Sequence, residues 1–288
     1  KSYVGALLKE CPDGVWRKGF GDWCAPNNGT WKGYFNDVEL VNSAIFCKIV
    51  GETAELAERV AENTDAKWFR AAAELAREAF HRTFYHPESA TYGDGSQTTA
   101  VLPLAFGLVP ADCRQNVAES LIRRIRQVDG KKLDTGIYGT RYIGEVLCDL
   151  GEVDLLLEMY TQPDYPGFGY MKSCGATTLW EQWRFKGGMN SHNHAMFAGG
   201  ASWLYSHLAG IRPDRPGYAS ILVQPVFPKK LNFLNARRRT PHGDVTVDWK
   251  RVGSEINLRV VAPNEVPTRL KLPDGRVLDV KGCIQVRI

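Results

Sequence analysis

Residues 245–261 contain two segments, Val245-Thr-Val-Asp-Trp249 and Ile256-Asn-Leu-Arg-Val-Val261, joined through a Gly-Ser turn. Apolar and polar residues alternate in both, which is typical of strands with one face buried. Residues 221–224 show the same alternation. Turn-forming residues separate these segments, at 241–244, 251–254 and 273–276. Short strands at this spacing predict an antiparallel β-sandwich over residues 211–288.

Residues 1–210 follow a different pattern, in which apolar residues recur every three or four positions, as on amphipathic helices. A helix is predicted over residues 36–50, with Gly51 ending it. The helix that follows Thr64 is predicted to bury Trp68 and Leu75 in a larger apolar face. The chain as a whole is therefore predicted to be mainly α, with a separate β domain at its C-terminal end.

The composition excludes several classes of protein. The 288 residues are 44% hydrophobic, enough for a large core, and no apolar run reaches the roughly 20 residues of a membrane-spanning helix. A net charge of +4 is small for this length and does not indicate a nucleic-acid partner. Seven cysteines at irregular spacing, with no signal segment after Lys1, weakly favour a reducing cytoplasmic setting.

Sequence motifs for cofactors are also missing. The glycine pairs at 19–21 and 93–95 lack the strand-turn-helix context of a phosphate-binding loop. His192 and His194 lie two residues apart, which suits one helix face poorly, and no third ligand is near them in the sequence. No cofactor and no metal site are predicted.

The most distinctive motif is Gly175-Ala-Thr-Thr-Leu-Trp-Glu-Gln-Trp183, within a turn-rich stretch at residues 162–190. Its single carboxylate, Glu181, lies between Trp180 and Trp183. Indole faces stack on the apolar face of a sugar ring, and a carboxylate can accept a proton from water. Equally, both indoles could belong to the core, with Glu181 at the surface. The residues alone leave these two interpretations open.

Two further clusters combine polar and aromatic side chains. Gly19-Phe-Gly-Asp-Trp23 places Asp22 and Trp23 in a loop. Residues 189–197 open a helix predicted over 193–208, which puts His194 in its first turn. A histidine at a helix start is more often structural than functional, and Asn193 or Ser191 is a natural helix cap.

These clusters, in this order, resemble family 78 glycoside hydrolases, the α-L-rhamnosidases. The matching stretches cover nearly the whole chain, at 21–23, 134–142, 176–183, 189–194, 203–205, 209–214 and 217–218. The resemblance implies an (α/α)6 barrel followed by a β-sandwich, a carbohydrate substrate, and inverting hydrolysis of terminal α-L-rhamnosides. It further implies a role for each matching residue: Glu181 as general base, His194 and Trp23 as sugar-binding residues, and Asp22 and Trp180 as pocket lining.

In that family the general acid lies in an Arg-Asp-Glu segment upstream of the Gly-Asp-Trp loop, and this chain contains no Arg-Asp-Glu. The chain is therefore expected to be the C-terminal part of such an enzyme, with a partial barrel, and to be inactive alone. An incomplete barrel would expose apolar helix faces and favour association. The alternatives are another (α/α)6 glycosidase or lyase, or a carbohydrate-binding protein without catalysis.

Overall fold

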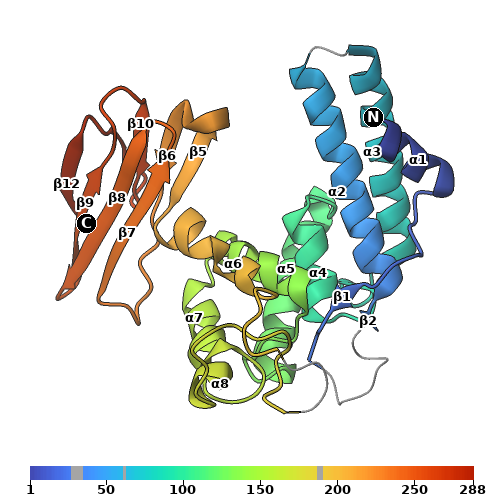
Figure 1. Cartoon of the computed structure of the whole chain (residues 1–288), viewed down its shortest axis with the longest axis horizontal. Helices are drawn as coiled ribbons and strands as arrows, with labels where there is room; N and C mark the ends of the chain where they lie inside the picture. The colour runs from blue at the N-terminus through green and yellow to red at the C-terminus, as the bar shows by residue number, and fades with distance from the viewer. Residues whose placement is uncertain (27–34, 61–62, 187–190) are drawn as a thin grey trace. The chain divides into compact units, whose positions relative to one another are not determined.

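The computed structural model describes residues 1–26, 35–60, 63–186 and 191–288, which form two compact units (Figure 1). The first unit, here called the helical unit, comprises residues 1–146 and 158–199. The second comprises residues 147–157 and 200–288 and is called the sandwich unit. These compact units divide the chain within two helices, after residues 146 and 157, and again at residue 200, whereas the sequence predicts a domain boundary at residue 210.

The helical unit begins with α1 (Ser2–Glu10), followed by the long helices α2 (Val38–Arg59) and α3 (Asn63–Phe84), which lie side by side (Figure 1). The predicted helix end at Gly51 is wrong, because α2 continues through that glycine for two more turns. One glycine inside a helix costs only about 1 kcal/mol, and the residues after it are strong helix formers. The local stop signal is therefore overridden.

The predicted buried face of α3 is only partly correct. Phe69, Ala76 and Phe80 are buried as expected. Trp68 is 50% exposed and Leu75 is 67% exposed, so the prediction that these two residues are buried is wrong. They lie seven positions apart, two turns along the helix, and so belong to a second apolar stripe that this structure leaves facing solvent.

Shorter helices complete the helical part of the chain, and they are α4 (Gln97–Ala105), α5 (Ala111–Arg123), α6 (Ile137–Asp149), α7 (Val153–Thr161) and α8 (Phe168–Ser173). A π-helical turn, Arg124–Val128, extends α5. Gly151, with a φ of 77°, lies between α6 and α7. Two short antiparallel strand pairs are also present. One is formed by β1 (Asp22–Trp23) and β2 (Phe35–Asn36), and the other by β3 (Tyr85–His86) and β4 (Thr91–Tyr92). No helix among the described residues is both long and apolar enough to cross a membrane.

The helix predicted over residues 193–208 is not formed as a single α-helix. Residues 191–197 are irregular, and a 3₁₀ turn (Ala198–Ala201), two α-helical residues at 202–203 and a π-helical turn (Leu204–Leu208) follow. Adjacent Gly199 and Gly200 weaken helix formation there. The backbone of residues 191–194 instead pairs with residues 179–181. His194 therefore does not lie in the first turn of a helix.

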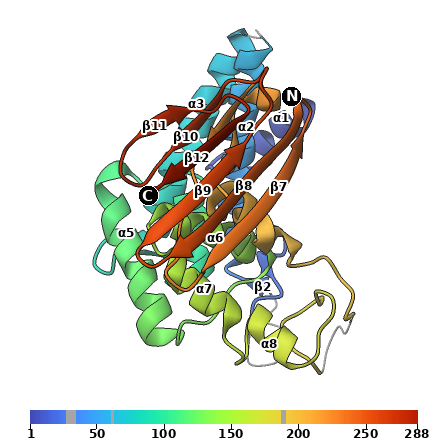
Figure 2. The same ribbon diagram turned by 90° about the vertical axis from the view of Figure 1, so that its left-hand side faces the viewer.

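The sandwich unit contains two four-stranded sheets. One has the order β11-β10-β6-β5 and the other β12-β9-β8-β7, with the latter seen face-on in Figure 2. The strands of the first sheet are β5 (Ile211–Arg215), β6 (Ser220–Val223), β10 (Thr268–Lys271) and β11 (Val277–Asp279). Those of the second are β7 (Phe233–Thr240), β8 (Gly243–Val252), β9 (Glu255–Val261) and β12 (Cys283–Arg287).

Both sheets contribute to one core, which confirms the predicted sandwich. Ile221, Val223 and Leu270 of the first sheet pack in the same buried cluster as Val247 and Trp249 of the second. All strand pairs are antiparallel except β6 with β10, which are parallel and pair Ile221 with Thr268. The alternating pattern of the sequence thus corresponds to the inner faces of two packed sheets.

Candidate functional site

The segment that carries Glu181 is held by backbone hydrogen bonds to residues 191–194. The Glu181 N–H donates to the Ser191 carbonyl at 2.9 Å, and the His194 N–H donates to the Leu179 carbonyl at 2.9 Å. The Ser191 N–H in turn donates to Oε2 of Glu181 at 3.2 Å. The Glu181 side chain is half-buried. The carboxylate is thus oriented by a backbone donor while part of it stays accessible, which suits a proton acceptor.

The two indoles on either side of Glu181 are core residues. Trp180 is 2% exposed and stacks on His192, with ring centroids 4.6 Å apart. Trp183 is also buried, stacks on Phe197 at 4.0 Å, and donates its indole N–H to the Thr135 carbonyl at 2.8 Å. The burial of both indoles agrees with the interpretation that places them in the core. The role of Trp180 as pocket lining stays a prediction.

His194 is exposed beside the Glu181 segment. Its Nδ1 accepts a hydrogen bond from the Met196 N–H at 3.0 Å. In the neutral ring the proton must then reside on Nε2, which makes Nε2 a donor. A donor of this kind suits a sugar hydroxyl. Met189 and Asn190, which belong to the motif that predicted His194, lie outside the described residues.

Asp22 is completely buried and accepts four hydrogen bonds. The Thr98 hydroxyl and the Gly136 N–H (2.7 Å) donate to Oδ2, and the N–H groups of Tyr138 (2.8 Å) and Gly139 (3.2 Å) donate to Oδ1. Burial raises the pKa of Asp22, although these donors favour the carboxylate. The role of Asp22 as pocket lining stays a prediction; in the structure its carboxylate fixes the start of α6.

Trp23, the neighbour of Asp22, is partly exposed and lines a pocket of about 230 Å³. The other lining residues of this pocket are Phe20, Gly21, Ile137 and Tyr138. Cys24, directly after Trp23, lies within electrostatic range of Glu181. Burial raises the pKa of the Cys24 thiol to about 12, and the nearby carboxylates of Glu181 and Asp22 add to the effect. The structure therefore brings the Trp23 loop and Glu181 into one region of the helical unit.

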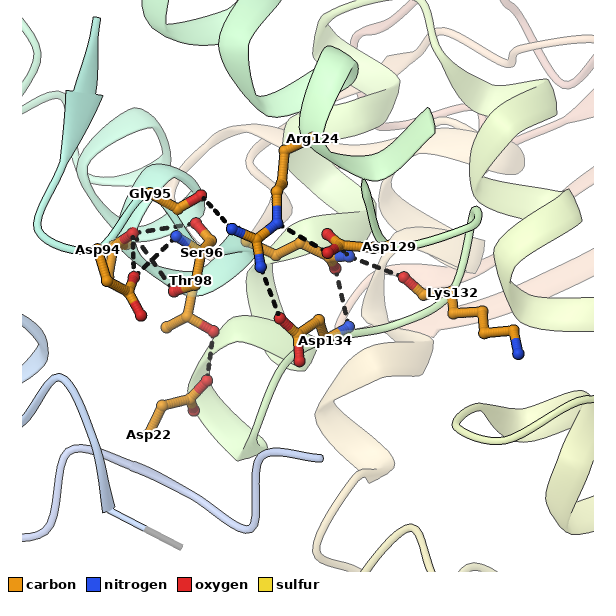
Figure 3. A network of polar contacts seen from close by, with 11 residues as sticks. Asp22, Asp94, Gly95, Ser96, Thr98, Arg124, Asp129, Lys132 and Asp134 are labelled. Carbon is orange, nitrogen blue, oxygen red and sulfur yellow. Dashed lines mark hydrogen bonds and ion pairs between the residues drawn. The ribbon is translucent and has the colours of Figure 1, made fainter. Parts of the chain in front are cut away.

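A polar network holds the chain that leads into α6 (Figure 3). The Arg124 guanidinium donates to Oδ1 of Asp129 at 2.7 Å and lies 3.6 Å from Oδ2 of Asp134. The buried Gln97 side chain donates to Asp129 (2.8 Å) and to the Lys132 carbonyl (2.7 Å). Through these contacts, residues 129–134 are held against the N-terminal end of α4.

Two carboxyl groups of this region have raised pKa values. Burial, together with the nearby charge of Asp129, raises the pKa of Asp134 to about 6. Burial and a hydrogen bond shared with Asp94 raise the pKa of Asp37 to about 7. Asp37 also has left-handed backbone dihedrals, with a φ of 42°, directly before α2. Sequence reasoning did not select any of these groups, since their proximity arises only in the folded chain.

Tyr138 and Phe20 were also not predicted as site residues. Tyr138 belongs to the matching stretch at 134–142, and Phe20 lies inside the glycine-bordered loop at 19–23, so both were close to recognised motifs. What distinguishes them is exposure beside Trp23, and exposure cannot be deduced from an isolated aromatic residue.

Comparison with known proteins relates this site to a family. Residues 1–208 match the bacterial alpha-L-rhamnosidase 6 hairpin glycosidase domain, and residues 210–286 match the bacterial alpha-L-rhamnosidase C-terminal domain. An alpha-L-rhamnosidase of Formosa agariphila is 30% identical over 264 residues, and one of Alteromonas sp. is 30% identical over 268. Each of these matches spans 88% of this chain but less than a third of the relative, 28% and 29% respectively.

Solved structures agree with this assignment. The alpha-L-rhamnosidase from Dictyoglumus thermophilum superposes with a TM-score of 0.93 at 30% identity, over 99% of this chain and 35% of that chain. The Streptomyces avermitilis alpha-L-rhamnosidase, solved in complex with L-rhamnose, superposes with a TM-score of 0.88 at 25% identity, over 100% of this chain and 30% of that one. The chain therefore belongs to the GH78 α-L-rhamnosidase family, as a segment of its helical hairpin glycosidase domain followed by its C-terminal β domain.

Proposed function

We propose that this chain carries the general-base half of an inverting α-L-rhamnosidase site, with Glu181 as the base. The observation that carries the proposal is the half-buried Glu181 carboxylate, oriented by the Ser191 N–H within a chain of this family. In inversion, one carboxylate removes a proton from water while a carboxylic acid on the opposite side protonates the leaving oxygen. Glu181 is the candidate for the first role.

The relatives support a proposal for the substrate class. The Streptomyces avermitilis protein was solved with L-rhamnose, and this chain shares its fold across the full length of the match. We propose a terminal α-L-rhamnoside as the substrate. His194 would donate a hydrogen bond from Nε2 to a sugar hydroxyl, and Trp23 would offer its partly exposed indole to the apolar face of the ring.

Asp22 and Trp180 support the site without touching the sugar. Asp22 holds the backbone of residues 136–139 next to Trp23, and Trp180 anchors the segment of Glu181 in the core through its stack on His192. Both are positioning residues in this proposal.

The second carboxylic group is proposed to come from an upstream Arg-Asp-Glu segment of the longer protein, since the curated relatives are more than three times the length that this chain spans. The test therefore uses the full-length protein and an aryl α-L-rhamnoside. Glu181→Gln should lower kcat by about 10²–10⁴-fold, the usual contribution of general acid–base catalysis, and leave L-rhamnose binding intact. Glu119→Gln, at an exposed glutamate on α5, is the matched control.

The stereochemistry of the product gives an independent readout. Proton NMR of the first product should show the β-anomer of rhamnose, because water attacks from the face opposite the leaving group. Near-normal turnover by Glu181→Gln would remove the assignment of the base. Saturable binding of L-rhamnose with no release of aryl alcohol would favour the alternative of a carbohydrate-binding protein, and release from other aryl glycosides would favour a different sugar preference.

A further inference from the structure

The pocket beside Trp23 has walls from two segments that are distant in sequence. Phe20, Gly21 and Trp23 form one wall, and Ile137 and Tyr138, in the first turn of α6, form the other. Its volume of about 230 Å³ is below the range of roughly 300–1,000 Å³ that is typical of sites for drug-sized ligands. The pocket therefore has room for a small group such as one ring, and not for a whole oligosaccharide.

The walls of this pocket are mainly apolar and aromatic. Phe20 is 66% exposed and Tyr138 is 37% exposed, so both rings present surface to a ligand. Phe20 meets Trp23 edge to face, with centroids 5.9 Å apart. Among the described lining residues, the side-chain polar groups are the Tyr138 hydroxyl and the Trp23 indole N–H. A sugar bound here would leave most of its hydroxyls without partners, whereas an aromatic ring requires none.

The two walls are held at a set separation. The Asp22 carboxylate, one residue from Trp23, accepts hydrogen bonds from the N–H groups of Tyr138 and Gly139. The backbones also approach closely, since a Cβ added at Gly136 would lie 2.3 Å from the Trp23 carbonyl oxygen. A pocket whose walls are already positioned loses less conformational entropy on binding.

The pocket and the proposed sugar site share Trp23, which lines the pocket. The Trp183 indole also ties the Glu181 segment to Thr135, two residues before Ile137. A group attached to the sugar would thus lie near the second wall of this pocket when the sugar contacts Trp23. This position suits the leaving group of a glycoside.

We propose that the pocket formed by Phe20, Gly21, Trp23, Ile137 and Tyr138 binds the leaving group of the substrate and selects planar aromatic aglycones over sugars. This inference rests on the proposed function, in that it takes the sugar to be bound at Trp23 and His194. It assigns specificity to two residues, Phe20 and Tyr138, that take no part in the proposed acid–base chemistry.

The test compares two ligands that differ only in the leaving group. Titration calorimetry on this chain with phenyl α-L-rhamnoside and methyl α-L-rhamnoside measures the preference for the aromatic group. We expect phenyl α-L-rhamnoside to bind about tenfold more tightly, which is the upper range for one aromatic contact. Phe20→Ala should reduce that preference to threefold or less.

Three further variants make the test specific. Tyr138→Ala should also reduce the preference, whereas Tyr138→Phe should retain it, because the ring and not the hydroxyl makes the contact. Phe233→Ala, at a phenylalanine of the sandwich unit that is 64% exposed, should change neither affinity. Equal affinities of the native chain for the two glycosides would overturn the inference, and so would a preference that survives both Phe20→Ala and Tyr138→Ala.

The inference about the pocket and the proposed function can fail independently of each other. If the full-length protein hydrolyses α-L-rhamnosides and this chain shows no preference for the phenyl group, the pocket inference fails and the function stands. If the chain prefers phenyl α-L-rhamnoside through Phe20 and Glu181→Gln retains full turnover, the pocket inference stands and the assignment of the base fails.

Discussion

The sandwich unit and the helical unit protect their apolar surfaces in different ways. In the sandwich unit, alternate residues of both sheets point into one shared core, which includes Val247, Trp249 and Leu270. In the helical unit, α3 buries Phe69 and Phe80 on one side. The same helix exposes a second apolar stripe, with Trp68 and Leu75, on another.

This difference follows from how the sheets of a sandwich and the helices of a hairpin ring cover each other's apolar surfaces. Two packed sheets cover each other, so a sandwich core is complete once both sheets have formed. A helix in a ring of hairpins contacts neighbours on several sides, and each hairpin covers only part of the next. The matched family domain has six hairpins, and the exposed stripe of α3 is the kind of surface that a further hairpin would cover. We therefore expect the sandwich unit to be the more self-sufficient of the two.

The largest effect is expected in the core of the sandwich unit. Trp249 is buried and meets Phe227 edge to face at 5.3 Å. Trp249→Ala should lower the free energy of unfolding of the sandwich unit by about 3–5 kcal/mol, through lost burial and the cavity left behind. Scanning calorimetry should show the sandwich transition at lower temperature with the helical transition unmoved. A common shift of both would contradict the independence of the units.

A somewhat smaller effect is expected from the buried carboxylate of the helical unit. Asp22→Asn keeps the shape of the side chain but places an amide donor against backbone N–H groups. At least one buried donor then loses its acceptor, and we expect a cost of about 1–3 kcal/mol for the helical unit alone. Urea unfolding followed by tryptophan fluorescence measures it, with the exposed Asp112→Asn as control. Unchanged stability in Asp22→Asn would refute the positioning role.

The pH dependence of stability should also distinguish the units. The pKa of Asp37 is raised to about 7 in the folded chain, so between about pH 4 and pH 7 the folded state binds more protons there than the unfolded state. The free energy of unfolding of the helical unit should therefore fall as the pH rises through this range. Asp134, with a pKa of about 6, acts in the same direction. Asp37→Asn should flatten the profile, and a slope identical to that of the native chain would exclude Asp37 as its source.

The smallest effect on stability is expected on the exposed stripe of α3. Leu75→Gln should change the free energy of unfolding by no more than about 0.5 kcal/mol, because the side chain loses little burial. Its effect should appear instead in association, measured by light scattering at increasing concentration. We expect less self-association in Leu75→Gln than in the control Lys67→Gln. Equal scattering by the two variants would show that the stripe does not drive association.

Features that depend on a local pattern were predicted well from the sequence. Alternation of apolar residues identified the strands around Trp249. Predictions that required knowledge of distant partners were less successful. The helix predicted over 193–208 forms only from residue 198 onward, because residues 191–194 pair with residues 179–181 instead.

The same distinction applies to the site. Glu181 stood out in the sequence because a lone carboxylate between two tryptophans is uncommon in a loop rich in turns. The sequence could not decide whether those tryptophans face a ligand or the core, since an indole suits both environments. Asp22 was selected for its position beside Trp23, yet its four hydrogen-bond donors come from residues 76 to 117 positions away.

The amino-acid sequence by itself determined the two classes of architecture, the family resemblance and the choice of Glu181, His194 and Trp23, because periodicity and short motifs are properties of neighbouring residues. Only the tertiary structure decided that Trp180 and Asp22 are buried supports, that Phe20 and Tyr138 share a pocket with Trp23, and that one stripe of α3 remains exposed. Burial and exposure depend on which distant segments meet, and a short stretch of sequence does not contain that information.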